Sequence, residues 1–337
     1  MAPRRLSLLS PVVLAAALAL LAAPGCRSPR SGDAPRSKPP RIAVVPMGTT
    51  HEFWKSVHAG ALTAARELGA EIVWKGPLRE DDRNEQVQIV ETLAGSGIDA
   101  LVLSPLDDRA LVRPVSEARR AGIPTVVFNS ALQGGEHAAF VSTDNALGGA
   151  LAARAVGRLL GGRGRLIMVR VKAGVEGTAR REEGFLAALR TEFPAVEVVS
   201  ENQYGGTSTE TAYQTMESLL ARFGPVEGLF TPNESTTFGC LRALQDHGLA
   251  GRVVHVGFDA SEKLIEALDK GELAGLVLQD PFAMGERSLR TAVAVLRGEP
   301  YEKTVATAVV LATRENMAEP AVSRLLRPDL SILGSEK

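Results

Sequence analysis

Short apolar runs alternate with longer amphipathic segments along the chain from residue 41 onward. The runs at 42–47 and 100–104 show no alternation of polar and apolar residues, which is typical of strands buried on both faces of a sheet. Across 49–69, apolar residues recur every three or four positions, which predicts a helix. Thr49 and Glu52 have the spacing of a capping box, so the helix is expected to start there.

The same cycle of strand and helix repeats through residue 278. The predicted strands are 42–47, 71–74, 100–104, 125–129, 166–171, 196–200, 228–231, 253–256 and 273–278, and the predicted helices are 49–69, 82–94, 107–121, 145–160, 178–190, 208–223, 234–248 and 261–270. Helical connections between buried strands indicate parallel sheets that are covered on both faces. About ten such strands are too many for one sheet of ordinary size, so the pattern predicts an α/β fold with two doubly wound parallel-sheet lobes.

Polar and aromatic residues follow the predicted strands at the positions where open parallel sheets bind their ligands. These candidate binding residues are His51, Phe53, Trp54, Ser104, Asn129, Arg181, Tyr204, Asn233, Phe258, Asp259 and Gln279. Asn and Gln both donate and accept hydrogen bonds, Asp accepts, and Arg donates in a planar fork. Flat rings with one cation, one anion and several neutral groups suit a small polyol, whose axial hydrogens can lie against an aromatic face.

Each of these residues also has a structural alternative. Phe53 lies on the apolar stripe of its helix and could belong to the core, whereas Trp54 points about 100° away from that stripe, toward a cleft or over the end of the lobe. Asn233 and Asp259 could each cap the helix that follows. Arg181 could be one member of a solvated charge run. The set is therefore more informative than any one member.

The first 26 residues have the pattern of an export signal. Arg4 and Arg5 precede an apolar run over 6–23, and small residues lead to Cys26. We expect residues 1–25 to be a signal peptide, with Cys26 lipidated as in the lipobox of bacterial lipoproteins. An uncleaved membrane anchor is the alternative, because about 18 apolar residues could just span a bilayer.

Residues 26–40 hold the lipidated cysteine and a segment rich in Pro, Ser and Arg, which predicts a flexible tether. An exported protein anchored by lipid to a bacterial membrane, in the periplasm or on the cell surface, is the expected result.

Composition and charge exclude several classes of protein. The chain has 337 residues, of which 45% are apolar and 23% charged, as in ordinary globular proteins. Its net charge of −1 argues against a nucleic-acid partner. Cys26 and Cys240 are the only cysteines, and the five histidines are scattered, so neither a disulfide framework nor a metal site is expected.

Catalytic motifs are also missing from the sequence: no P-loop, no GxSxG and no HExxH occurs. We therefore expect no catalytic residues, no cofactor and no enzyme activity.

Several motifs occur in an order that resembles the periplasmic sugar-binding proteins of the ribose-binding type, the type I solute-binding proteins of ABC importers. The resemblance covers almost all of residues 41–312. The motifs that carry it are Glu52-Phe53-Trp54, Gly97-Ile98-Asp99-Ala100, Ala121-Gly122-Ile123-Pro124, Ser142-Thr143-Asp144-Asn145, Gly148-Gly149, Arg181 with Gly184-Phe185, Asn233-Glu234, Gly257-Phe258-Asp259 and Gln279-Asp280-Pro281.

The resemblance implies a sugar-binding cleft between two lobes. It implies that Phe53, Trp54 and Phe258 sandwich the sugar ring, with Tyr204 as a further wall. The polar contacts fall on Ser104, Asn129, Arg181, Asn233, Asp259 and Gln279. Ribose binders commonly have Asn in place of His51 and an Asp-Arg pair in place of Asn129-Ser130, so these departures argue against ribose itself.

The resemblance also implies a division of the chain and a partner. The N-terminal lobe would comprise 41–143 and 280–311, and the C-terminal lobe 144–279 and 312–330, joined by a three-strand hinge that closes over the ligand. The implied function is a monomeric binding protein that delivers a small sugar or polyol to an ABC permease and its ATPase. The alternative is a receptor that presents its closed form to a membrane sensor or chemoreceptor.

Overall fold

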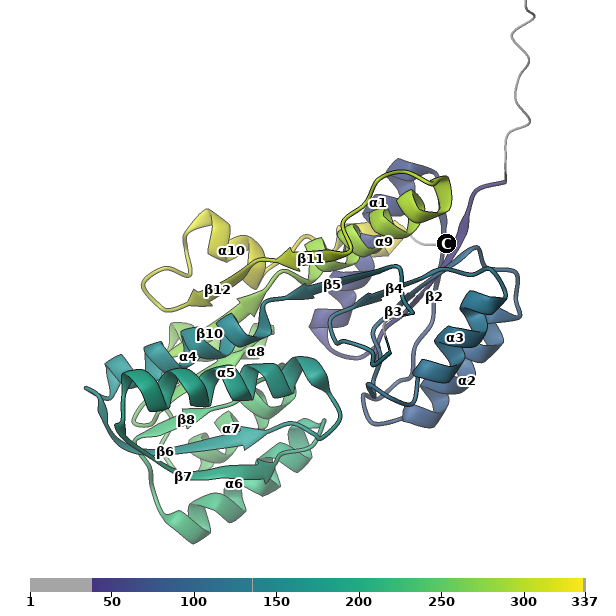
Figure 1. Ribbon diagram of the computed structural model, residues 1–337. Helices are drawn as coiled ribbons and strands as arrows, with labels where there is room; N and C mark the ends of the chain where they lie inside the picture. Colours follow the sequence, from purple (N-terminus) through teal and green to yellow (C-terminus); the bar gives the residue numbers. More distant parts are fainter. Residues whose placement is uncertain (1–37, 135, 336–337) are drawn as a thin grey trace, which may run out of the picture. The chain divides into compact units, whose positions relative to one another are not determined.

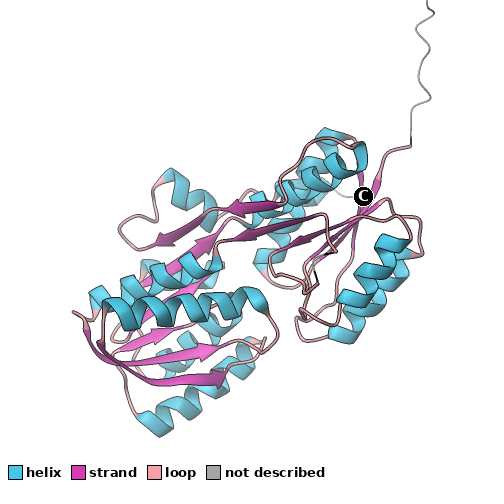
Figure 2. Cartoon of the chain, in the orientation of Figure 1, coloured by secondary structure: helices cyan, strands magenta, loops and turns pink. Residues whose placement is uncertain are grey.

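The computed structural model describes residues 38–134 and 136–335, which form two six-stranded sheets with helices on both faces (Figures 1 and 2). The predicted signal peptide, Cys26 and nearly all of the predicted tether lie outside these residues. The prediction of an α/β fold with two parallel-dominated sheets is confirmed.

The first sheet has the strand order β11-β5-β4-β3-β1-β2, and all neighbouring strands run parallel. Its strands are β1 (Arg41–Val45), β2 (Glu71–Trp74), β3 (Ala100–Leu103), β4 (Thr125–Phe128), β5 (Ala139–Thr143) and β11 (Thr304–Thr307). The helices around it are α1 (Glu52–Leu68), α2 (Arg83–Ala94), α3 (Val112–Arg120) and α9 (Pro281–Arg297).

Strand β1 shows why these strands read as continuous apolar runs. Ile42 and Val44 pack on the side of α1 and α9, whereas Ala43 and Val45 pack on the side of α2 and α3. Both faces of the strand are buried, so no polar position alternates with the apolar ones.

The second sheet has the order β12-β10-β9-β8-β6-β7, in which only the pairing of β12 with β10 is antiparallel among the described strands. Its strands are β6 (Arg163–Arg170), β7 (Ala195–Tyr204), β8 (Gly228–Phe230), β9 (Val254–Phe258), β10 (Gly275–Gln279) and β12 (Val309–Ala312). The helices around it are α4 (Asn145–Leu159), α5 (Glu176–Glu192), α6 (Thr209–Phe223), α7 (Glu234–Asp246), α8 (Glu262–Asp269) and α10 (Pro320–Leu326), and a 3₁₀ turn follows at Ser331–Ser335.

Helices cover the second sheet on both faces as well. Helices α4 and α5 share one apolar core with the sheet, whereas α6 and α7 share a second core on the opposite side. Helices α8 and α10 extend that covering over β10. Cys240 is fully buried in α7, where it acts as a small apolar side chain.

The chain passes between the two sheets three times: between β5 and α4, between β10 and α9, and between β11 and β12 (Figure 1). The third passage lies between Thr307 and Val309, so the predicted division at residue 311 is wrong by a few residues. Residues 304–312 contain no Gly or Pro that would mark the boundary, and only Ala308 separates the two short strands.

The start of α1 also differs from the prediction. The helix begins at Glu52 with His51 as its N-cap, and no side chain caps it. Thr49 does not form the predicted capping box, since its hydroxyl donates instead to the carbonyl of Pro77 at 3.4 Å.

Candidate ligand-binding site

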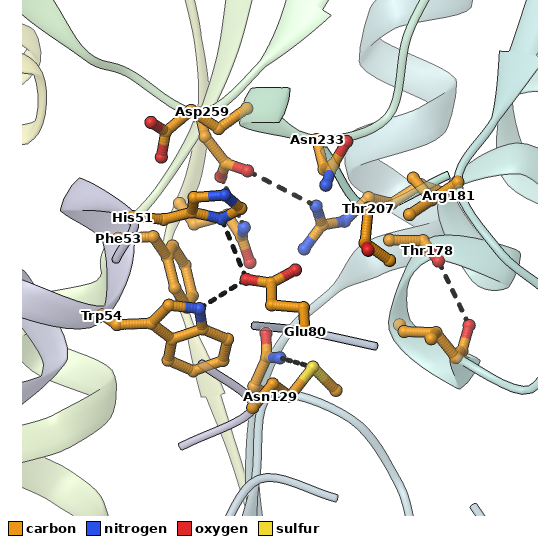
Figure 3. A pocket seen from close by; sticks show the side chains of 16 residues that line it. His51, Phe53, Trp54, Glu80, Asn129, Thr178, Arg181, Thr207, Asn233 and Asp259 are labelled. Atoms are coloured by element: carbon orange, nitrogen blue, oxygen red, sulfur yellow. Dashed lines mark hydrogen bonds and ion pairs between the residues drawn. The ribbon is translucent and has the colours of Figure 1, made fainter. Parts of the chain in front are cut away.

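A cavity lies where the carboxyl ends of strands from both sheets meet (Figure 3). Its lining residues are Met47, His51, Phe53, Trp54, Glu80, Asn129, Val171, Val175, Gly177, Thr178, Arg181, Thr207, Asn233, Glu234, Asp259 and Gln279. Eight of the eleven predicted binding residues are therefore brought together: His51, Phe53, Trp54, Asn129, Arg181, Asn233, Asp259 and Gln279.

The other three predicted residues do not line the cavity. Ser104 is fully buried, and its hydroxyl accepts a hydrogen bond from the amide of Asn129 at 3.2 Å, so it holds a lining residue in place. Phe258 is fully buried beneath Arg181, whose guanidinium carbon lies 4.4 Å from the centre of the ring. Tyr204 is 48% exposed at the end of β7, and Thr207 is the residue of that loop which reaches the cavity.

Two lining residues have an unusual backbone conformation. Asn129 and Asp259 have φ angles of 63° and 66°, and they are the only non-glycine residues with positive φ in the described chain. Each follows directly after a strand end, and Asn and Asp tolerate this conformation better than other residues. Strained backbone of this kind gathers at binding sites, which supports assigning this cavity as functional.

Arg181 is held rigidly although it is charged and only 3% exposed. Its Nε donates to Oδ1 of Asn145 at 2.8 Å, and one terminal nitrogen donates to the carbonyl of Pro232 at 2.8 Å. The same nitrogen lies 3.9 Å from the carboxylate of Asp259. The solvated charge run proposed as an alternative for Arg181 is therefore wrong.

Gly149 allows helix α4 to approach the backbone of Arg181. A Cβ atom at position 149 would lie 1.9 Å from the carbonyl oxygen of Arg181, a distance at which no side chain fits. The absence of a side chain at this position thus helps to place the guanidinium at the cavity wall.

Asn233 has both of the roles considered from the sequence. It is the N-cap of α7, where Oδ1 accepts from the backbone N–H of Thr236 at 3.1 Å. It also lines the cavity. Asp259, in contrast, does not cap α8, whose N-cap is Ser261; its carboxylate accepts from Nε2 of Gln279 at 2.7 Å.

Glu80 is a lining residue that was not predicted from the sequence. Its Oε1 accepts from the indole N–H of Trp54 at 2.5 Å and lies 2.9 Å from Nδ1 of His51 (Figure 3). Burial alone would disfavour both charges, but their hydrogen bond and mutual attraction outweigh it. The pKa of His51 is raised to about 9, and the pKa of Glu80 is lowered, so both groups are charged at neutral pH.

Glu234 is a second acidic residue that was missed as a site residue. Burial, which is the largest cause, raises the pKa of Glu234 to about 7, and the nearby carboxylates of Asp259, Glu80 and Glu52 add to this effect. His51 opposes the shift. The cavity thus contains three carboxyl groups and two cations, rather than the single anion and single cation expected from the sequence.

Hydrogen bonds from backbone N–H groups to side chains join the two lobes beside the cavity. The backbone N–H of Gly177 donates to the hydroxyl of Ser130 at 3.3 Å, and the backbone N–H of Ala131 donates to the carboxylate of Glu176 at 3.3 Å. Ser130, which directly follows Asn129, therefore contributes to contact between the lobes.

Comparisons with known proteins agree with this fold and site. The periplasmic binding protein domain family matches residues 42–300. The chain is 27% identical over 259 residues to the xylitol-binding protein of Mycolicibacterium smegmatis, covering 77% of this chain and 73% of that protein.

Two solved structures are similar over most of the chain. A carbohydrate transporter solute-binding protein from Agrobacterium radiobacter, in complex with D-arabinose, has a TM-score of 0.83 at 30% identity, covering 86% of this chain and 100% of the other. An ABC transporter solute-binding protein from Agrobacterium vitis with bound D-fucose has a TM-score of 0.81 at 32% identity, covering 85% and 100%.

The chain belongs to the periplasmic binding protein family, as its resemblance to type I solute-binding proteins indicated. Members of this family bind solutes outside the cytoplasm and are not enzymes. Within residues 38–134 and 136–335, no helix is both long and apolar enough to cross a bilayer, and no group of three or more potential ligands forms a metal site.

Proposed function

We propose that this protein captures a small sugar or polyol in the cavity between its lobes and delivers it to an ABC permease and its ATPase. The observation that carries the proposal is the convergence of Arg181, Asn233, Asp259 and Gln279 on one cavity from four separate segments of the chain. His51, Phe53 and Asn129 face the same cavity from the other lobe. A ligand bound there contacts both lobes at once.

The chemistry of the cavity suits a polyhydroxylated ligand. Each sugar hydroxyl both donates and accepts, and the side chains of Asn129, Asn233 and Gln279 offer both functions. Arg181 and Asp259 add charge-assisted hydrogen bonds. The ring of Phe53, which packs against Trp54 at a centroid distance of 4.8 Å, supplies an apolar surface for the sugar ring. The relatives bind xylitol, D-arabinose and D-fucose, which are ligands of this class.

Closure of the lobes couples binding to delivery. The chain passes between the sheets at three short segments, and these can act as a hinge. A ligand that contacts both lobes stabilises the closed form, which is the form that a permease can distinguish from the open one. We further propose that residues 1–25 direct export and that lipidated Cys26, with the tether through residue 40, anchors the protein to the membrane.

A thermal-shift screen with D-ribose, D-arabinose, xylitol, D-fucose and D-galactose tests the proposed function. A ligand present at 100 times its Kd stabilises the folded protein by about 2.7 kcal/mol, so at least one of these compounds should raise the melting temperature by several degrees. The rise should grow with ligand concentration. If no pentose, hexose or polyol changes the melting temperature, the protein does not bind sugars and the proposed function is wrong.

A further inference from the structure

Two buried side-chain atoms of the cavity lining have no hydrogen-bond partner among the described residues. They are Oε2 of Glu234 and Oε1 of Gln279. Gln279 is only 3% exposed, and its amide nitrogen is already bonded to Asp259. Both atoms are hydrogen-bond acceptors, so a ligand that satisfies them must bring hydrogen-bond donors to these two positions.

The carboxyl groups of the cavity differ in how their charge is compensated. Glu80 is paired with His51 and the indole of Trp54, and Asp259 lies beside Arg181 and Gln279. Within the described residues, Glu234 forms no ion pair with a Lys, Arg or His side chain. Burial is the largest cause of its raised pKa of about 7, and the charge of His51, which is already paired with Glu80, opposes the shift only in part. Ionisation at this position is therefore costly unless a further cation is supplied.

A protonated amine meets both requirements. It brings a positive charge to the carboxylate, and it has three N–H donors and no acceptor. A neutral hydroxyl would donate one hydrogen bond to Glu234 but bring no positive charge, so the carboxyl would either stay a poorly compensated buried anion or take up a proton.

We propose that the ligand of this cavity is a sugar or polyol that carries a protonated amine, and that Glu234 binds this amine as a carboxylate. The proposal rests on the proposed function, since it names a substrate class for the same site. The carbonyl of Gln279 accepts a further N–H or O–H of the ligand. Arg181, Asn129 and Asn233 remain available for its hydroxyl groups. The ligands named for the relatives are neutral, so this chain differs from them in the charge of its ligand.

Matched pairs of ligands test the proposal by isothermal titration calorimetry at pH 7. The pairs are D-glucosamine with D-glucose, D-galactosamine with D-galactose, D-mannosamine with D-mannose, and 1-amino-1-deoxy-D-sorbitol with D-sorbitol. Within a pair, the two compounds differ only by an amine in place of a hydroxyl. We expect the amine to bind at least tenfold more tightly than its hydroxyl partner in at least one pair.

The Glu234→Gln variant links this preference to one side chain. Glutamine has nearly the same shape but no charge, so the ratio of the two affinities in that pair should fall to about one. Glu52→Gln is the matched control, because Glu52 is a nearby acid whose side chain is 45% exposed, pairs with Lys55 and does not line the cavity. This control should keep the preference for the amine.

Thermal melting of the ligand-free proteins shows whether the Glu234→Gln variant folds. Because the folded-state pKa of Glu234 is above its ordinary value, wild type has its full stability relative to the variant at pH 4.5 and below, and loses it as the pH rises through 7. The melting temperature of the variant minus that of wild type should therefore be larger at pH 8 than at pH 4.5.

The outcomes separate this inference from the proposed function. If the hydroxyl compound binds as tightly as the amine in every pair, the amine proposal is overturned while sugar binding stands. If the Glu234→Gln variant keeps the preference for an amine, the assignment to Glu234 is overturned. If the thermal-shift screen finds a sugar but none of the amines binds, the amine proposal is overturned while sugar binding stands. If no compound binds in either experiment, the proposed function fails, and the inference fails with it.

Discussion

Replacing Arg181 with methionine is expected to lower the free energy of unfolding by about 3–5 kcal/mol and to abolish ligand binding. The guanidinium is buried against Asn145, Pro232 and Asp259, so its removal leaves a buried carboxylate without its cation. Methionine retains most of the apolar stem, and therefore the loss reports the charge and its hydrogen bonds. Urea denaturation measures the stability, and calorimetric titration measures the binding.

Arg180→Met is the matched control for this prediction. Arg180 is the preceding residue on α5, its side chain is 60% exposed, and it pairs with Glu176 and Glu183 on the surface. Its replacement should change the free energy of unfolding by no more than about 0.5 kcal/mol. If the two substitutions changed the free energy of unfolding and the affinity equally, the charge of Arg181 would contribute no more to stability and binding than that of a surface arginine.

Asp259 gives the second large effect. Asp259→Gly is expected to weaken ligand binding by a factor of about 10² to 10⁴, because two charge-assisted hydrogen bonds of about 1.5–3 kcal/mol each are lost. Glycine adopts a φ of 66° freely, so this substitution removes the carboxylate without straining the backbone. Alanine is a poorer choice, because it adds the cost of a left-handed conformation, about 1–2 kcal/mol.

Asp259→Asn is the control that keeps both the shape and the tolerance for positive φ. Its amide oxygen still accepts hydrogen bonds, but without charge, so its affinity should lie between those of wild type and Asp259→Gly. Calorimetric titration of the three proteins with one ligand gives this order. If Asp259→Gly binds as tightly as wild type, the carboxylate does not contact the ligand.

Much of the fold could be predicted from the sequence because parallel strands covered on both faces are continuous apolar runs. Three strands were missed. β5 has buried side chains alternating with half-buried ones, and β11 and β12 are short strands at the edges of their sheets, with Thr304 and Ala306 of β11 exposed. Segments of this kind gain their structure from pairing with neighbours, which a local pattern does not show.

Most of the site could be predicted from the residues at strand ends and in the segments that follow them. Asp259 fits this rule, but Phe258, one residue earlier, faces the opposite way into the core because side chains alternate along an extended chain. Glu80 lies six residues beyond the end of β2, within the charged segment 79–83, which reads as solvated surface. Its pairing with His51 and Trp54 depends on tertiary structure, so no local pattern predicts it.

A crystal structure of the protein with its bound ligand tests the central claim most directly, which is that one cavity lined from both lobes holds the sugar. We expect polar ligand atoms within hydrogen-bond distance of Arg181, Asn233 and Asp259 on one side, and of His51 or Asn129 on the other. A ligand bound outside this cavity, or in contact with the side chains of only one lobe, would contradict the claim.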